Sequence, residues 1–182
     1  SNKDIHIIEE KTKTKVLCQE ALSGGSINNI SLLETTTLPL VVKYNSSEEC
    51  PNMFEYEKKG LEKLGQTKTI RIVEIINHIN SDHLSFLILN YIQPKKETKK
   101  FWENFGIKLN QLHQNQSRSF GLDSPNYIGN LPQLNNWCST WTEFYVTQRL
   151  EPQLKKAIEK GFLKGLTQQF EKLFHNIDTL FP

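Results

Sequence analysis

The sequence predicts an α+β fold in which a five-stranded antiparallel β lobe with one helix precedes a lobe of helices. A pair of glycines in SGGS lies between two segments rich in β-forming residues, a pattern typical of a hairpin. A helical pattern at 51–65 interrupts the strands, and the composition turns helical beyond a lysine-rich stretch at 95–100. We therefore expect one lobe over residues 1–92 and a second over 93–182.

Composition excludes several classes of protein. The chain has 182 residues and a formal net charge of +2, which favours neither nucleic-acid binding nor attachment to a membrane surface. It shows no membrane-spanning apolar run and no apolar region of a signal peptide at its start. The three cysteines have no CxxC spacing and the five histidines no ligand spacing. We expect reduced thiols, a cytoplasmic location and no metal bound by protein groups alone.

Three strands are expected before the first long helix. They follow a short leading element with a small apolar cluster at residues 5–8, and they occupy the segment from Lys15 to Asn45. In the third strand, alternation places Leu40, Val42 and Tyr44 on one face and Lys43 on the other. The ammonium group of Lys43 should therefore lie over a cleft rather than inside a core.

The helix expected from Pro51 to Gly65 carries a carboxylate on its apolar stripe. Proline in the first turn and glycine at the end are typical helix boundaries. Glu57 shares a face with the apolar residues Met53, Phe54, Leu61 and Leu64. Burial of an unpaired charge is costly, so Glu57 needs a cationic partner, and Lys43 is the candidate. The alternative is that Glu57 reaches solvent at the edge of the stripe.

The charged residues of the same helix form a second face. Glu55 with Lys59 and Lys58 with Glu62 are spaced four residues apart, which favours ordinary exposed ion pairs. This spacing separates Glu57 from the other carboxylates of the helix.

The rest of the chain predicts two more strands and three helices. The strands are expected at Ile70–Ile79 and His83–Ile92, followed by a solvated linker. Amphipathic helices are expected at Phe101–His113, at 137–154 with a kink at Pro152, and at Phe162–Ile177. We expect the segment from Gln114 to Asn136 to be a loop.

A glycine hairpin followed by a strand lysine is the arrangement that covers nucleotide phosphates in kinase-type folds. Backbone N–H groups can approach an anion closely where side chains are absent. Taken alone, the same residues also fit an ordinary turn and a solvated lysine.

A longer set of motifs resembles the fructosamine kinase (ketosamine-3-kinase) family. The run NYIGNLPQLNNWCSTWTEFYVTQRLEPQL, from Asn126 to Leu154, has the order and spacing of that family's signature. The segments SGGSIN, VVKYN and MFEYEKKGLEKL match its phosphate loop, lysine strand and helix. The resemblance implies a protein-kinase-like two-lobe fold and the use of ATP and Mg²⁺. It also implies phosphorylation of the 3-hydroxyl of ketosamines, with a ketosamine or glycated amine as partner and no nucleic acid or membrane.

The resemblance assigns roles to individual residues. The phosphates would be covered by Gly24, Gly25, Ser26 and Ile27. Lys43 would hold the α- and β-phosphates, and Glu57 would fix Lys43. Asn90, Tyr91 and Ile92 would form the hinge that binds adenine through backbone groups, so replacing Asn90 by alanine should barely change nucleotide affinity. Family members often have glutamate in place of Asn90 and cysteine in place of Ser26.

The chain departs from the family at its end. The family continues with an HGDLW-type segment that carries the catalytic base and then an aspartate that binds Mg²⁺, whereas this chain stops at Pro182 without HGD, HRD or DFG. We expect the catalytic aspartates beyond Pro182, a truncated helical lobe and no phosphate transfer by this chain alone. The alternatives are a catalytically dead nucleotide-binding or interaction protein, or a related aminoglycoside- or choline-type phosphotransferase.

Overall fold

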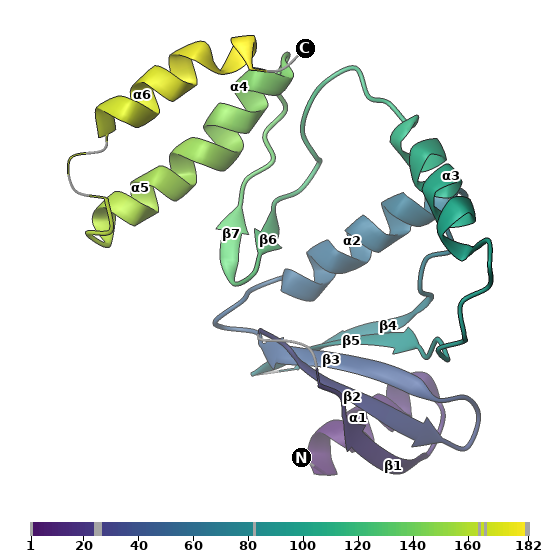
Figure 1. Cartoon of the computed structure of the whole chain (residues 1–182). Helices are drawn as coiled ribbons and strands as arrows, with labels where there is room; N and C mark the ends of the chain where they lie inside the picture. Colours follow the sequence, from purple (N-terminus) through teal and green to yellow (C-terminus); the bar gives the residue numbers. More distant parts are fainter. Residues whose placement is uncertain (1, 24–26, 82, 164, 166, 181–182) are drawn as a thin grey trace. The chain divides into compact units, whose positions relative to one another are not determined.

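The computed structural model describes residues 2–23, 27–81, 83–163, 165 and 167–180. The chain forms two compact units, Ser1–Asn115 and Gln116–Pro182, and Figure 1 shows the elements of each. The first of these units includes the helix at 101–113, which follows the predicted hinge. The predicted division into a nucleotide-binding lobe at 1–92 and a helical lobe at 93–182 is a functional one, which these compact units do not test. It stays a prediction.

The first unit contains a five-stranded antiparallel sheet in the order β1-β2-β3-β5-β4. Its strands are β1 (Val16–Ala21), β2 (Asn29–Thr35), β3 (Leu40–Ser46), β4 (Ile75–Asn80) and β5 (Leu84–Asn90). All five lie where strands were predicted, but β4 begins at Ile75 and not at Ile70. The reason is the length of its partner: Ile75 pairs with Leu89, and β5 ends one residue later.

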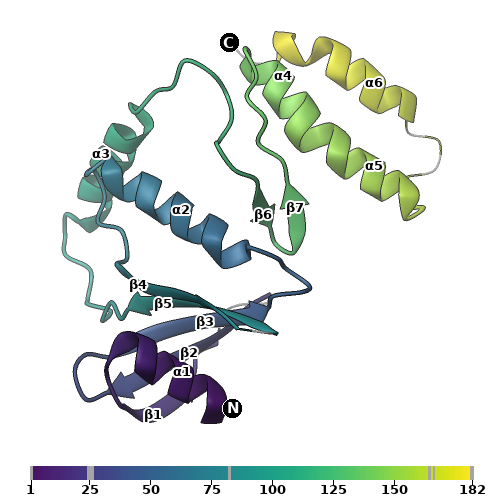
Figure 2. The same ribbon diagram turned by 180° about the vertical axis from the view of Figure 1, so that it is seen from behind.

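One face of the sheet carries the main apolar core of this unit. The leading element is a helix, α1 (Asn2–Thr12), and it covers this face in Figures 1 and 2. This helix adds to the one helix predicted for the lobe. The residues of the core cluster are almost fully buried: Ile8, Leu33, Leu40, Val42, Ile79, Phe86 and Ile88. Tyr44 packs against it, which confirms the predicted alternation along β3.

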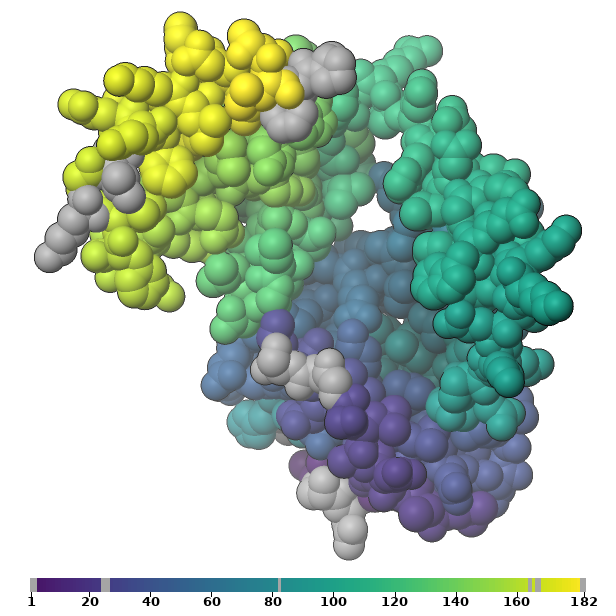
Figure 3. All heavy atoms as spheres, viewed as in Figure 1, coloured from purple at the N-terminus to yellow at the C-terminus, as the bar shows by residue number. Residues whose placement is uncertain are grey.

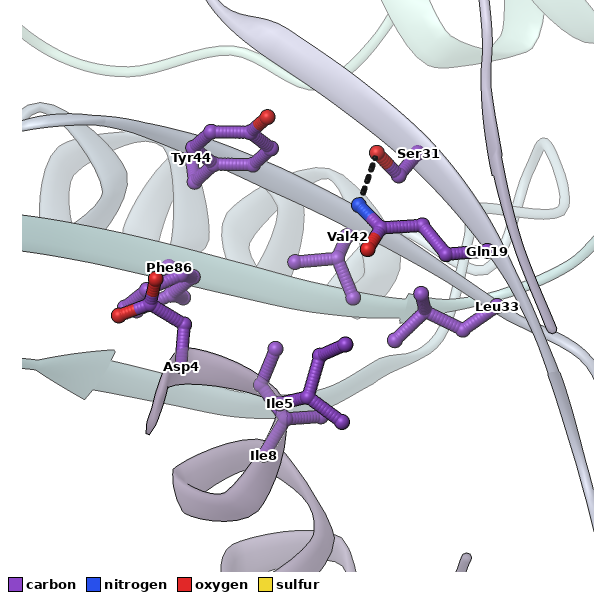
Figure 4. Close-up of a pocket in the computed structure, with 9 residues that line it drawn as sticks. All are labelled: Asp4, Ile5, Ile8, Gln19, Ser31, Leu33, Val42, Tyr44 and Phe86. Atoms are coloured by element: carbon purple, nitrogen blue, oxygen red, sulfur yellow. Dashed lines mark hydrogen bonds between the residues drawn. The ribbon is translucent and has the colours of Figure 1, made fainter. Parts of the chain in front are cut away.

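A small cavity of about 60 Å³ lies between α1 and the sheet. Figure 4 shows Ile5 and Ile8 of α1 pointing toward Val42 and Leu33 of the strands. A hydrogen bond of 3.0 Å from Gln19 Nε2 to Ser31 Oγ lies at its edge. The cavity therefore belongs to the α1 face and not to the face that carries Lys43.

The second helix, α2 (Met53–Gln66), covers the opposite face of the sheet (Figure 2). Met53 and Phe54 are buried, and Phe54 is fully enclosed. The predicted apolar stripe is correct for this first turn and wrong for the last one, because Leu64 is 40% exposed. The sheet therefore supports mainly the N-terminal half of α2, the half that carries Glu57.

Helix α3 (Phe101–His113) agrees with the predicted range but contains no buried residue. Figure 3 shows its side chains, in teal, on the surface of the first unit. The rings of Phe101, Trp102 and Phe105 contact one another, with the centroids of Phe101 and Trp102 5.0 Å apart. The amphipathic pattern thus predicted the helix correctly, while its apolar side chains remain largely exposed in this chain.

The second unit begins with a hairpin where a loop was predicted. Strands β6 (Asn126–Ile128) and β7 (Leu131–Gln133) pair antiparallel across a two-residue turn. Gly129 adopts a φ of +66° in that turn. A Gly-Asn dipeptide between two apolar residues is a recognised hairpin signal, so the sequence did contain the information.

The helices of the second unit are more broken than predicted. They are α4 (Trp141–Tyr145), a π-helical turn (Val146–Leu150), α5 (Glu151–Glu159), α6 (Thr167–Asn176) and a 3₁₀ turn (Ile177–Thr179). The π-helical turn leads without a break into α5 and directly precedes Pro152, whose ring nitrogen has no N–H to donate to the preceding turn. In the described part of the chain, no helix has the length and apolarity needed to cross a membrane.

Candidate functional site

Lys43 and Glu57 form a close ion pair on the α2 face of the sheet. Lys43 Nζ lies 2.6 Å from Oε1 and 2.7 Å from Oε2 of Glu57. The two side chains are 20% and 30% exposed, so the pair is screened from most solvent yet reachable from it. The predicted partnership is confirmed: Glu57 is paired with Lys43, although its side chain still reaches solvent in part.

Local structure explains why these two residues meet. Strand alternation turns Lys43 away from the core that holds Val42, toward α2. Lys43 Nζ also lies 5.9 Å from the centroid of the Phe54 ring, one turn before Glu57. An aromatic face attracts a cation, which adds to the attraction by the carboxylate.

The other charges of α2 behave as the sequence predicted. Glu55 and Lys59 form an exposed pair at 2.7 Å, and Lys58 and Glu62 a looser one at 3.9 Å. The hydrogen bond from Lys59 lowers the pKa of Glu55, and the same bond raises the pKa of Lys59. One helix thus carries a solvent-facing ion pair and a sheet-facing ion pair of the same chemistry.

Strand alternation places Asn45 on the same face as Lys43, but the sequence did not predict its contacts. Its Nδ2 donates to the Ile27 carbonyl at 3.1 Å and to Asn28 Oδ1 at 2.9 Å. Its Oδ1 accepts from the backbone N–H of Ser46 at 2.8 Å. The available signal was its position two residues after Lys43, on the same face of β3. Asn45 ties the residues that follow the glycine pair to the strand of Lys43.

The predicted phosphate loop is only partly described. Gly24, Gly25 and Ser26 lie outside the described residues, and Ile27 is 39% exposed. On either side of them β1 and β2 are paired, and Leu22 N–H donates to the Ile30 carbonyl at 2.9 Å. The hairpin is therefore present, and its binding of phosphate stays a prediction.

The predicted hinge begins at Asn90, the last residue of β5. Asn90 N–H donates to the Glu74 carbonyl at 3.0 Å, and Tyr91 N–H donates to the Pro39 carbonyl at 3.2 Å. The side chain of Asn90 also takes part, because its Oδ1 accepts from Glu74 N–H at 2.7 Å. The role of residues 90–92 in binding adenine stays a prediction.

Lys43 and Asn90 belong to neighbouring strands of the same sheet. Lys43 pairs with Leu87, three residues before Asn90 on β5. At about 3.3 Å per residue the two positions are separated by about 10 Å along the strand. This separation suits a nucleotide whose base and phosphates bind at different points.

The described aspartates are Asp4 in the first unit and Asp123 and Asp178 in the second. Asp4 lines the cavity on the face opposite Lys43, Asp123 lies in an exposed loop, and Asp178 accepts a hydrogen bond from Thr142 in the second unit. Asp82 is not among the described residues. Within the described ranges, no three His, Cys, Asp or Glu side chains are grouped so that they could hold a metal ion.

The family model described as fructosamine kinase matches residues 2–182, almost the whole chain. The chain belongs to the fructosamine kinase family. The predicted resemblance to this family is thereby confirmed. The solved structures described below confirm the predicted protein-kinase-like α+β fold.

Individual members of the family show how much of the length is covered. A "Protein-ribulosamine 3-kinase, chloroplastic" of Arabidopsis thaliana is 34% identical over 96% of this chain and 54% of its own length. A "Probable ketoamine kinase" of Vibrio cholerae is 32% identical over 87% of this chain and 52% of its own. The chain therefore spans about half the length of the curated relatives it matches.

Solved structures agree with the fold. The crystal structure of a candidate fructosamine-3-kinase from Thermobifida fusca superposes with a TM-score of 0.82 at 27% identity. The match covers 99% of this chain and 62% of that one. A second candidate fructosamine-3-kinase, from Haemophilus somnus, gives a TM-score of 0.79 at 28% identity, over 89% of this chain and 56% of that one.

The fructosamine kinase signature in the second unit forms a connected polar network. Arg149, in the π-helical turn, donates from Nη1 to the Leu134 carbonyl at 2.7 Å and from Nη2 to Asn135 Oδ1 at 2.5 Å. Gln148 Oε1 accepts from Asn136 N–H at 3.1 Å. Partial burial lowers the pKa of Arg149, and its guanidinium lies 4.5 Å from the Phe144 ring centroid. These contacts give the PQ-x-N and QRL motifs a structural role in shaping the loop.

Proposed function

We propose that the protein containing this chain is an ATP-dependent kinase that phosphorylates the 3-hydroxyl of ketosamines, with Mg²⁺ as cofactor. The observation that supports this most is the Lys43–Glu57 contact in a chain of the fructosamine kinase family. In protein-kinase-type enzymes this ion pair must be assembled for phosphoryl transfer, because the lysine holds the α- and β-phosphates. The names of the relatives, ketoamine kinase and ribulosamine 3-kinase, favour a ketosamine as acceptor.

In the proposed reaction, the ketosamine O3 forms a bond to the γ-phosphorus of ATP. The bond from that phosphorus to the β–γ bridging oxygen breaks, ADP leaves with the electron pair, and the hydroxyl proton passes to a carboxylate base. Lys43 would stabilise negative charge on the α- and β-phosphates, and Glu57 would hold the ammonium group in place. A bound Mg²⁺ would neutralise further phosphate charge, but the described residues contain no group of three His, Cys, Asp or Glu side chains that could hold it, so we assign it no ligands in this chain.

The 182-residue chain by itself should bind nucleotide without transferring phosphate. Phosphoryl transfer needs an aspartate beside the acceptor hydroxyl, and Asp4, the described aspartate of the first unit, lines the cavity on the face opposite Lys43. The three cysteines, none of them in a disulfide, support the proposed cytoplasmic location.

A coupled ADP-release assay with fructosyl-lysine tests the proposal. The comparison is between this chain and a protein extended to the full length of its relatives, including an HGD segment. We expect turnover that depends on fructosyl-lysine from the extended protein and none from the 182-residue chain. Turnover by the short chain would contradict our assignment of the catalytic base. Absence of turnover by both proteins would favour a catalytically dead nucleotide-binding protein.

A further inference from the structure

The pairing of β4 with β5 ends in an irregular way at Asn90. In a regular hydrogen-bonded antiparallel pair, two opposite residues exchange both of their backbone N–H and C=O bonds. Asn90 keeps half of that exchange, because its N–H donates to the Glu74 carbonyl at 3.0 Å. The other half is changed: Glu74 N–H donates at 2.7 Å to the side-chain Oδ1 of Asn90 and not to its backbone carbonyl.

The short amide of asparagine makes this exchange possible. Asn side chains readily take the place of backbone groups in local hydrogen bonding. The ladder is already displaced here by the register shift between Ile75 and Asn77, of the kind that re-aims backbone groups. As a result, Glu74 N–H is taken by the side chain, and among the described residues outside the named strands no backbone N–H donates to the Asn90 carbonyl.

The next two residues complete the pattern. Tyr91 N–H is occupied by the Pro39 carbonyl on the β3 side. Ile92 N–H has no acceptor among the backbone contacts of the described residues, and the Ile92 side chain is 49% exposed. In an extended segment, the carbonyl of one residue and the N–H of the residue two positions on point to the same side. The carbonyl of residue 90 and the N–H of residue 92 thus offer one acceptor and one donor together.

We propose that the Asn90 amide is a positioning residue that keeps its own carbonyl available for the 6-amino group of adenine. Adenine carries a hydrogen-bond donor at that amino group beside an acceptor at N1, which complements the carbonyl of residue 90 and the N–H of residue 92. Without the side chain, Glu74 N–H would take the carbonyl of residue 90 as in a regular ladder. The inference rests on the proposed nucleotide binding. It revises the expectation that replacing the Asn90 side chain barely changes nucleotide affinity.

The test is a comparison of two nucleotides on the 182-residue chain by isothermal titration. ATP carries the 6-amino group, and purine riboside triphosphate lacks it. We expect Asn90→Ala to weaken ATP binding about five- to tenfold, about 1–1.4 kcal/mol, while the analogue changes less than about twofold. Asn90→Asp keeps a side-chain acceptor for Glu74 N–H and should retain the preference for ATP.

Asn77→Ala supplies the matched control, because it removes a different asparagine amide, one on β4 that donates to the Lys11 carbonyl at 3.3 Å. It should leave the ratio of the two affinities unchanged. Equal losses for both nucleotides in Asn90→Ala, or no loss for either, would overturn the inference while leaving the proposed function in place. Failure of the unaltered chain to bind ATP at all would overturn the proposed nucleotide site and the inference with it.

Discussion

The two faces of the five-stranded sheet use alternate residues of the same strands for different purposes. The α1 face is apolar, and Leu33, Val42, Phe86 and Ile88 on it are at most 2% exposed. The α2 face also has apolar residues, Phe54 and Leu87, but it includes the Lys43–Glu57 pair and the polar contact of His78 with Ser85. The difference indicates that one face supplies most of the stability, while the other combines packing with charge that a ligand can use.

The comparison of the two faces predicts that the largest loss of stability follows a change at Phe86, on the α1 face. Phe86→Ala should lower the free energy of unfolding by about 3–5 kcal/mol, because it removes a buried ring and leaves a cavity. Urea denaturation followed by circular dichroism measures it. Phe105→Ala on α3 removes the same atoms from a ring that is 41% exposed and should cost far less. Equal losses in the two variants would show that the α1 face is not the main source of stability.

The second effect should appear at the ion pair of the α2 face, and in binding rather than in folding. Lys43→Met should weaken ATP binding by at least about tenfold, equivalent to about 1.4 kcal/mol, because the phosphates lose their cation. Glu57→Gln should weaken it less, since the ammonium group remains but is held less firmly. Isothermal titration measures both.

The exposed pair on the same helix provides the control for that experiment. Lys59→Met and Glu55→Gln change the same chemical groups on the solvent side of α2, and both should bind ATP like the unaltered chain. If they weakened binding as much as the changes at Lys43 and Glu57, a general effect of charge on this lobe would explain the result, and the specific role of Lys43 would be refuted.

The sequence predicted the ion pair because helical periodicity is a local property. Glu57 and Glu55 are two residues apart, yet the 3.6-residue period places them on different faces. Strand alternation assigned Lys43 in the same way. Two local periods were therefore enough to choose the correct partners, although neither predicts a distance.

Features that depend on distant parts of the chain were harder to predict. Helix α1 is mainly polar, and its few isoleucines become a recognisable core face only once the sheet is present to cover. The start of β4 is set by where β5 ends. The Asn90 contact follows from that ending, so nothing in residues 90–92 themselves predicts it. Asn45 likewise contacts residues 17 and 18 positions away, a pairing that only the folded hairpin creates.

The smallest predicted effect concerns His78, on the α2 face. Its Nε2 lies 3.3 Å from Ser85 Oγ, whose own proton goes to Asn80 Oδ1 at 2.7 Å, so Nε2–H is the donor to Ser85. Burial lowers the pKa of His78 below its ordinary value of 6.5; Glu55 opposes this shift and Lys58 adds to it. The folded state therefore favours the neutral ring.

The sign of the pH dependence follows from that shift. Below pH 6.5 the unfolded chain binds a proton at His78 that the folded chain binds less readily, so the contribution of His78 to stability is complete above pH 6.5 and is lost as the pH falls below it. His78→Gln keeps an amide donor for Ser85 but does not titrate. The free energy of unfolding, measured by urea denaturation at about pH 7.5 and about pH 5.5, should fall more in the unaltered chain than in the variant. Equal losses of unfolding free energy in the two proteins would show that other groups cause the acid sensitivity and that protonation of His78 does not affect the stability of this face. A larger loss in His78→Gln would mean that the ring is stabilised by its proton, through Glu55, and that the carboxylate outweighs burial.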